Sequence, residues 1–232
     1  MVLVILAVIA GLLPSLGLFF WLRKRELPQE DYVEACNKAL LYGFLSTLLT
    51  IAGSAILQVV GNLTHILAIK VVGEIYHSFF ILALVEEGAK FFCMTRLIKK
   101  YRYSWLSVTI YMTIVAIGFS LIESIVYSFV TNPIQIIIGG VTMMHAGYGF
   151  VIGYFYGKSV YTQKKSYAVL GFIIAWLLHG IYDFTLTEEI LALHELVAFI
   201  PWILVIVAVV LIILLIRFVI KGQSQEKYNT LL

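Results

Sequence analysis

Ionisable side chains lie inside long apolar stretches of this chain. They are Glu86, Glu87, Lys90, Glu123, His145, His179 and Asp183. An ionised group at the centre of a bilayer costs roughly 2.5–3.5 kcal/mol on insertion scales, so each of these residues is a candidate functional residue. Carboxylates and imidazoles in one place can bind a divalent cation, activate water or relay protons.

The spacing of these residues assigns them different orientations. His179 and Asp183 are four residues apart and share a helix face, so Asp183 can ligate a metal beside His179 or orient its imidazole. Glu86 and Glu87 are adjacent on their helix, so their side chains diverge by about 100°. We expect one glutamate to face the site and the other to pair with Lys90.

The balance of charge favours a bound cation, because carboxylates outnumber lysine at this level of the chain. A divalent cation would offset the excess. Histidines with carboxylates form a zinc-ligand set that leaves a position for water, and an unpaired glutamate can be the general base. We expect Glu86 or Glu87 to activate water. The metal ligands would come from Glu123, His145, His179 and Asp183.

The composition requires a membrane. Hydrophobic residues make up 62% of the 232 residues and charged residues 12%, and the mean hydropathy is +1.00. A soluble fold of this size cannot bury so much apolar surface. We predict an all-α polytopic bundle, one integral membrane domain over residues 1–232, with about seven spans of roughly 20 residues. The expected spans are 1–22, 38–60, 76–97, 104–130, 134–158, 166–187 and 195–217. Residues 61–75 are expected to form a loop with an interfacial turn, and an interfacial helix there stays open.

Basic residues alternate between successive loops and predict the orientation. The loops rich in base are the first, third and fifth and the tail, whereas the sixth loop is acidic. Cytoplasmic loops carry the excess of lysine and arginine. We therefore expect the N-terminus outside, the C-terminus in the cytoplasm, and a multi-pass protein of the cell membrane.

The ionisable residues lie at similar depths in their predicted spans. At about 1.5 Å per residue, they lie roughly 6–16 Å below the outer ends of their spans, in the outer half of a core of about 30 Å. All of them fall in four consecutive spans. We expect these core helices, about 76–187, to face one another around a common site.

Other polar and small residues have structural interpretations. His77 is expected to be a hydrogen-bonded core residue, and His65 and His194 solvated loop residues. Cys36, placed in a polar loop, and Cys93 are expected to be free thiols. Small residues at four-residue spacing let helices approach closely, so the span containing His145 should pack tightly through Gly149, Gly153 and Gly157, with Gly147 alongside. Tyr148, Tyr154 and Tyr156 are treated mainly as interface tyrosines.

The ordered motifs resemble those of the PrsW family of bacterial intramembrane proteases. They are Glu86-Glu87-x-x-Lys90, Phe119-x-x-x-Glu123, His145 in its apolar helix, and His179-x-x-x-Asp183, within about residues 84–184. The related CAAX prenyl endoproteases and abortive-infection proteases have Glu-Glu-x-x-x-Arg, Phe-x-x-x-His and His-x-x-x-Asn instead. Lys90, Glu123 and Asp183 depart from that pattern and favour the PrsW branch.

The resemblance implies an endopeptidase that makes the first cut in a membrane-anchored anti-sigma factor, on the extracytoplasmic side. Glu86, Glu87, His145 and His179 would then be catalytic, with Lys90, Glu123 and Asp183 in support. The expected cofactor is zinc, and the expected partners are a single-span membrane protein and the lipid bilayer, with no nucleic acid. A mechanism with glutamate-activated water and no metal stays open.

Two other classes of function remain. A proton-coupled transporter or channel also uses intramembrane acids and histidines, but it predicts charges spread over the full depth and internal repeats. A CAAX-type processing protease or a non-enzymatic maturation partner would keep the fold. Loss of the glutamates would favour the partner role.

Overall fold

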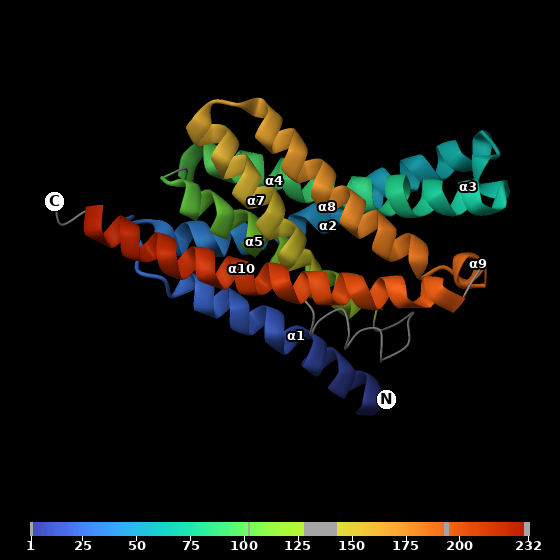
Figure 1. Cartoon of the computed structure of the whole chain (residues 1–232), viewed down its shortest axis with the longest axis horizontal. Helices are drawn as coiled ribbons and strands as arrows, with labels where there is room; N and C mark the ends of the chain where they lie inside the picture. The colour runs from blue at the N-terminus through green and yellow to red at the C-terminus, as the bar shows by residue number, and fades with distance from the viewer. Residues whose placement is uncertain (1, 102, 128–142, 193–194, 230–232) are drawn as a thin grey trace.

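The computed structural model describes residues 2–101, 103–127, 143–192 and 195–229, and in these ranges it contains helices and no strand. Figure 1 shows α7 and α8 side by side and α10 running along the bundle. The long helices are α1 (Val2–Arg23), α2 (Tyr32–Leu63), α4 (Val85–Tyr101), α5 (Trp105–Tyr127), α7 (Met144–Thr162), α8 (Lys165–Thr185) and α10 (Ile200–Asn229). The short ones are η1 (Ile66–Ala68), α3 (Lys70–Ile75), η2 (Tyr76–Leu84), α9 (Glu188–Leu191) and η3 (Glu195–Phe199).

Among the described residues, four helical segments are long and apolar enough to cross a membrane. They are Tyr32–Leu63, Trp105–Val126, Lys165–Thr185 and Leu196–Gln225. The all-helical class is therefore confirmed. The count of about seven spans and the orientation of the termini stay predictions. The expected range 134–158 falls partly outside the described residues.

Large apolar side chains on the outer helices face away from the protein interior. Leu48 and Ile51 of α2 and Ile206 of α10 are all exposed. Contiguous apolar surface of this kind marks contact with a membrane or a partner. The sides of the bundle therefore suit lipid.

The expectation of a loop over residues 61–75 is wrong for most of that range. Helix α2 continues to Leu63, the chain turns through η1, and α3 begins at Lys70 and leads directly into η2 and α4. Glycine makes the tight turn possible. A Cβ atom at Gly73 would lie 2.8 Å from the Leu67 carbonyl oxygen, and one at Gly61 would lie 2.8 Å from the Leu67 side chain.

Helix α5 forms the centre of the bundle and is buried along most of its length. The predicted glycine packing is confirmed against this helix. A Cβ atom at Gly149 would lie 2.5 Å from Ala116, and one at Gly153 would lie 2.9 Å from Met112. No side chain fits at these positions, so α5 and α7 make backbone-close contact.

The expected loop position of Cys36 is wrong, because this residue is buried in α2. The first loop ends earlier than its charges suggest, and the polar side chains at the start of α2 lie on the outer face of a helix. Cys36 and Cys93 are both free thiols, as expected.

Loops predicted to be cytoplasmic meet at one end of the bundle. The Tyr103 hydroxyl, which follows α4, donates to an Asp31 carboxylate oxygen over 2.5 Å. Gln223 near the C-terminus donates to the Glu26 carbonyl over 3.3 Å. The first loop, the third loop and the tail therefore lie together, as a single cytoplasmic face requires.

Candidate active site

A π-helical stretch leads into the first pair of site residues. In η2, the backbone carbonyls of Phe79 and Ile81 accept hydrogen bonds from Trp176 of α8 (2.6 Å) and Ser54 of α2 (2.7 Å). π-Helical turns are rare and often lie at functional sites. These contacts fix the beginning of α4, and hence Glu86 and Glu87, relative to α2 and α8.

Glu86 and Glu87 have different surroundings. Glu87 Oε1 accepts from Lys90 Nζ at 2.7 Å and lies 2.9 Å from His179 Nδ1. Glu86 Oε2 is buried and has no hydrogen-bond partner among the described residues. It lies 3.7 Å from His179 Nε2 and 3.8 Å from Lys90 Nζ. Glu87 Oε2 is likewise buried without a hydrogen-bond partner among the described residues. The two carboxylates differ in their closest contacts: Glu87 is held at 2.7 Å and 2.9 Å, whereas the ion contacts of Glu86 are 3.7 Å and 3.8 Å long.

His145 connects α7 to α5 and α4. Its Nε2 atom lies 2.6 Å from Glu123 Oε2, and its Nδ1 atom lies 3.1 Å from Lys90 Nζ. An ammonium group can only donate, so Lys90 favours a hydrogen on the Nε2 atom of His145. The glycine contacts between α5 and α7 hold the helices that carry this pair.

His179 of α8 contacts three acidic residues. Two of them are Glu86 and Glu87. The third is Asp183, one turn further along α8, whose Oδ2 atom lies 3.3 Å from His179 Nε2. A carboxylate that accepts from Nδ1 fixes the tautomer and leaves Nε2 to face the site. The imidazole rings of His145 and His179 lie 5.1 Å apart.

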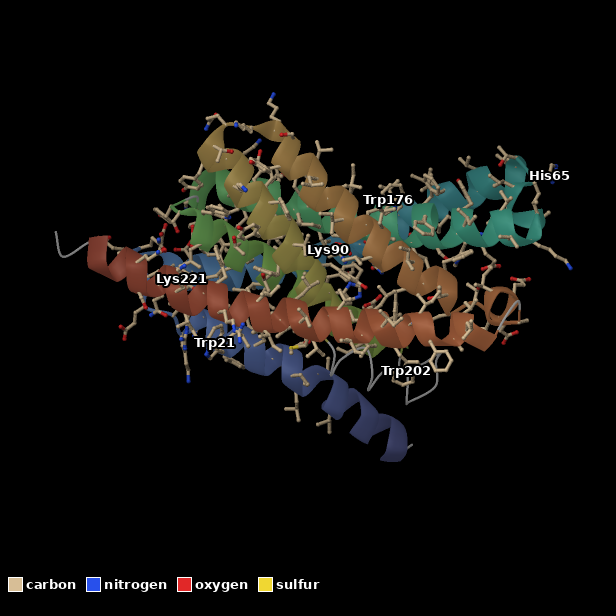
Figure 2. All side chains as sticks on the ribbon, in the orientation of Figure 1. Trp21, His65, Lys90, Trp176, Trp202 and Lys221 are labelled. Carbon is tan, nitrogen blue, oxygen red and sulfur yellow. The ribbon has the colours of Figure 1, made fainter. Side chains whose placement is uncertain are left out.

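Lys90 lies inside the bundle, as Figure 2 shows, and its side chain is fully buried. Its ammonium group is 4.2 Å from the Phe119 ring centroid. Together with the contacts to Glu87 and His145, this surrounds the cation completely. Exposure increases towards Glu123, His145 and Asp183, whose side chains are 18%, 13% and 19% exposed. The more exposed part of the site is therefore the part formed by α5, α7 and α8.

The donor set fits a catalytic metal ion. Glu86, His145 and His179 each offer a ligand atom within 4.8 Å of the others. Two imidazoles and a carboxylate, with a position left for water, are typical of catalytic zinc sites. The free, buried oxygen of Glu86 and the Glu87 contact to His179 also suit a metal. Glu123 and Asp183, predicted as ligands, each lie against one histidine of this group.

Tyr148, expected from the sequence to be mainly an interface tyrosine, is a site residue. Its ring stacks on His179 at 5.2 Å between centroids, and it lies 6.1 Å from the His145 ring. Its hydroxyl is buried and has no hydrogen-bond partner among the described residues. Such an unpaired group costs about 1–3 kcal/mol. The sequence pattern that could have identified Tyr148 is its three-residue spacing from His145, which puts the two residues on one helix face.

The remaining histidines lie elsewhere or are not described. His77 is half-buried in η2 and takes no part in the contacts above. His65 is exposed and has left-handed backbone geometry between α2 and η1. His194 lies outside the described residues.

Known proteins are similar in sequence to most of this chain. A family model described as "PrsW family intramembrane metalloprotease" matches residues 35–215. The Protease PrsW of Clostridioides difficile (strain 630) is 26% identical over 194 residues, which cover 77% of this chain and 78% of that protein. The Protease PrsW of Oceanobacillus iheyensis is 34% identical over 116 residues, covering 47% of this chain and 54% of that protein. No solved structure matches significantly.

Proposed function

Because this chain belongs to the PrsW family of intramembrane proteases, we propose that it cleaves a membrane-anchored protein near the outer side of the bilayer. One observation carries the proposal. The acidic and histidine residues of α4, α5, α7 and α8 form a single buried contact network, linked through Lys90 and His179. A hydrolytic site in a membrane needs a base, oriented histidines and protection from lipid, and this network supplies all three.

Glu86 is the general base in this proposal. Its unpartnered oxygen can accept the proton of a water molecule and later return it to the leaving amine. Glu87 is less suited, because Lys90 and His179 already hold its carboxylate. Its part is to orient His179.

The metal assignment is part of the proposal. His145 and His179 would hold zinc with a carboxylate from Glu123 or Asp183, each of which contacts one of these histidines, and Glu86 would stay free to act as the base. Zinc, when bound, polarises a carbonyl and makes a bound water more acidic. Glu87 and Lys90 fix the two imidazoles in either case.

The proposed substrate is a single-span membrane protein similar to an anti-sigma factor, cut on its extracytoplasmic side. The motif resemblance supports the substrate class. The depth of the site residues, counted from the outer ends of the spans at about 1.5 Å per residue, supports the side.

The test is cleavage of single-span reporters that carry different extracytoplasmic juxtamembrane sequences, reconstituted with the protein in vesicles. We expect Glu86→Gln to reduce cleavage at least about 1,000-fold, because the base is lost. The matched control is Glu188→Gln, the same change at an exposed residue of α9. Full activity of Glu86→Gln would remove Glu86 as the base, and failure of the wild-type protein to cleave any reporter would sink the proposal.

Zinc analysis of the purified protein tests the metal separately. We expect bound zinc in the wild-type protein and reduced zinc in His179→Ala. Active protein reproducibly without zinc would instead favour water activated by Glu86 alone.

A further inference from the structure

Tyr148 combines burial, proximity to the site and a free hydrogen-bond donor. The residue is 3% exposed, and its hydroxyl has no hydrogen-bond partner among the described residues. The ring lies almost parallel to His179, at 23°, and almost perpendicular to His145, at 88°. It therefore lies at the site and not on the far side of α7.

Among the described residues, the lysine and imidazole donors of the site already have acidic or imidazole partners. Lys90 Nζ contacts Glu87 and His145. Of the imidazoles, His145 Nε2 contacts Glu123, and His179 Nδ1 contacts Glu87. Peptide hydrolysis develops negative charge on the carbonyl oxygen, and a preorganised donor aimed at that oxygen is usually the largest single contribution to catalysis.

From this geometry we propose that the Tyr148 hydroxyl donates a hydrogen bond to the oxyanion of the tetrahedral intermediate. The inference rests on the proposed endopeptidase function and adds a catalytic residue to it. Stacking on His179 holds the phenol in place, so the donor needs no reorganisation when the charge develops.

Hydrolysis of the peptide bond by this route needs only water, Glu86 and Tyr148. The water oxygen bonds to the carbonyl carbon while Glu86 takes its proton, and the carbonyl π electrons move to oxygen. Tyr148 stabilises that oxygen by a hydrogen bond and keeps its proton. The C–N bond then breaks as the electron pair reforms the carbonyl, and Glu86 returns the proton to the departing nitrogen.

The experiment is Tyr148→Phe, which removes the hydroxyl and keeps the ring against His179. With a single-span reporter that the wild-type protein cleaves, we expect kcat to fall about 100-fold and KM to stay within about twofold. Tyr154→Phe is the matched control, the same change on α7 beside Trp105 and Phe218. The control should keep wild-type kcat. A Tyr148→Phe kcat within about threefold of wild type would overturn the inference.

A binding measurement separates donation from a merely structural role. A peptide phosphinate carries a tetrahedral anion and needs no turnover, so its affinity can be measured by calorimetry. Tyr148→Phe should weaken phosphinate binding by the same factor as kcat, and an unchanged affinity would overturn the inference. An inactive Glu86→Gln variant beside a fully active Tyr148→Phe would remove this inference alone. A fully active Glu86→Gln variant would remove Glu86 as the base, and a wild-type protein that cleaves no reporter would remove the endopeptidase proposal.

Discussion

Lys90 contacts Glu87 and His145 with one fully buried ammonium group. Removing one partner of a buried ion pair leaves an uncompensated charge and typically costs about 3–5 kcal/mol. We expect Lys90→Met to lower the free energy of unfolding by about this amount, measured by denaturation in detergent micelles. Lys70→Met, at an exposed position of α3, is the control.

A double variant tests whether the stability lost in Lys90→Met comes from the unpaired charge of Glu87. In Lys90→Met/Glu87→Gln the unpaired charge is gone, so part of the lost stability should return. If the double variant is as unstable as the sum of the two single variants, the pair is not the source of the effect.

At the scale of helices, α7 is held against α5 by glycine. A Cβ atom at Gly153 would lie 2.9 Å from both Met112 Cβ and the Thr109 carbonyl oxygen. We expect Gly153→Val to push the helices apart, lower Tm and reduce cleavage at least about tenfold, because His145 and Glu123 lie on these two helices. Gly17→Ala, where a Cβ atom has open space, is the control. Unchanged activity of Gly153→Val would show that this contact does not position the site.

The contact between α3 and α9 gives the protein a pH-dependent region. Burial and the neighbouring Glu189 carboxylate raise the pKa of Glu74 above its usual value. A carboxyl whose folded-state pKa is raised contributes stability below its unfolded pKa and loses it as pH rises through the folded pKa. Hydrogen exchange of α9 amides, corrected for intrinsic rates, should therefore show more protection at pH 4 than at pH 8.

Glu74→Gln keeps the uncharged form at every pH and should remove this dependence. Glu30→Gln, an exposed residue of the first loop, should leave it intact. Protection of α9 that rises with pH would contradict the assignment.

For the whole molecule, α1 and α10 run in the same direction along the bundle (Figure 1). This supports opposite sides for the two termini. In a variant with alanine at Cys36 and Cys93, we expect Thr64→Cys to react with an impermeant maleimide in intact cells, and Gln163→Cys to react only after lysis. Both positions are exposed. The reverse pattern would invert the predicted orientation.

Sequence reasoning found the ionisable residues because burying charge in lipid is costly enough to single them out. Their grouping followed from depth, which depends only on the rise per residue. It missed the helical start at Lys70, because a lysine in a short apolar run is typical of a loop near the interface. It missed the site position of Tyr148, because an interface tyrosine and a buried one have the same sequence pattern. The π-helix of η2 depends on contacts from Trp176 and Ser54, which no local pattern contains.

The number of residues in η2, the π-helical stretch before α4, determines the directions in which Glu86, Glu87 and Lys90 point. Each residue added to or removed from a helix turns everything after it by about 100°. Deleting one residue within η2 would therefore bring Glu87 towards the direction that Glu86 now occupies, and Lys90 would leave the position from which it reaches His145. Substitutions in Tyr76–Leu84 can change the packing of the segment, but a change in its length would move both glutamates out of their present directions. Active homologues should thus vary here in residue type and keep the residue number.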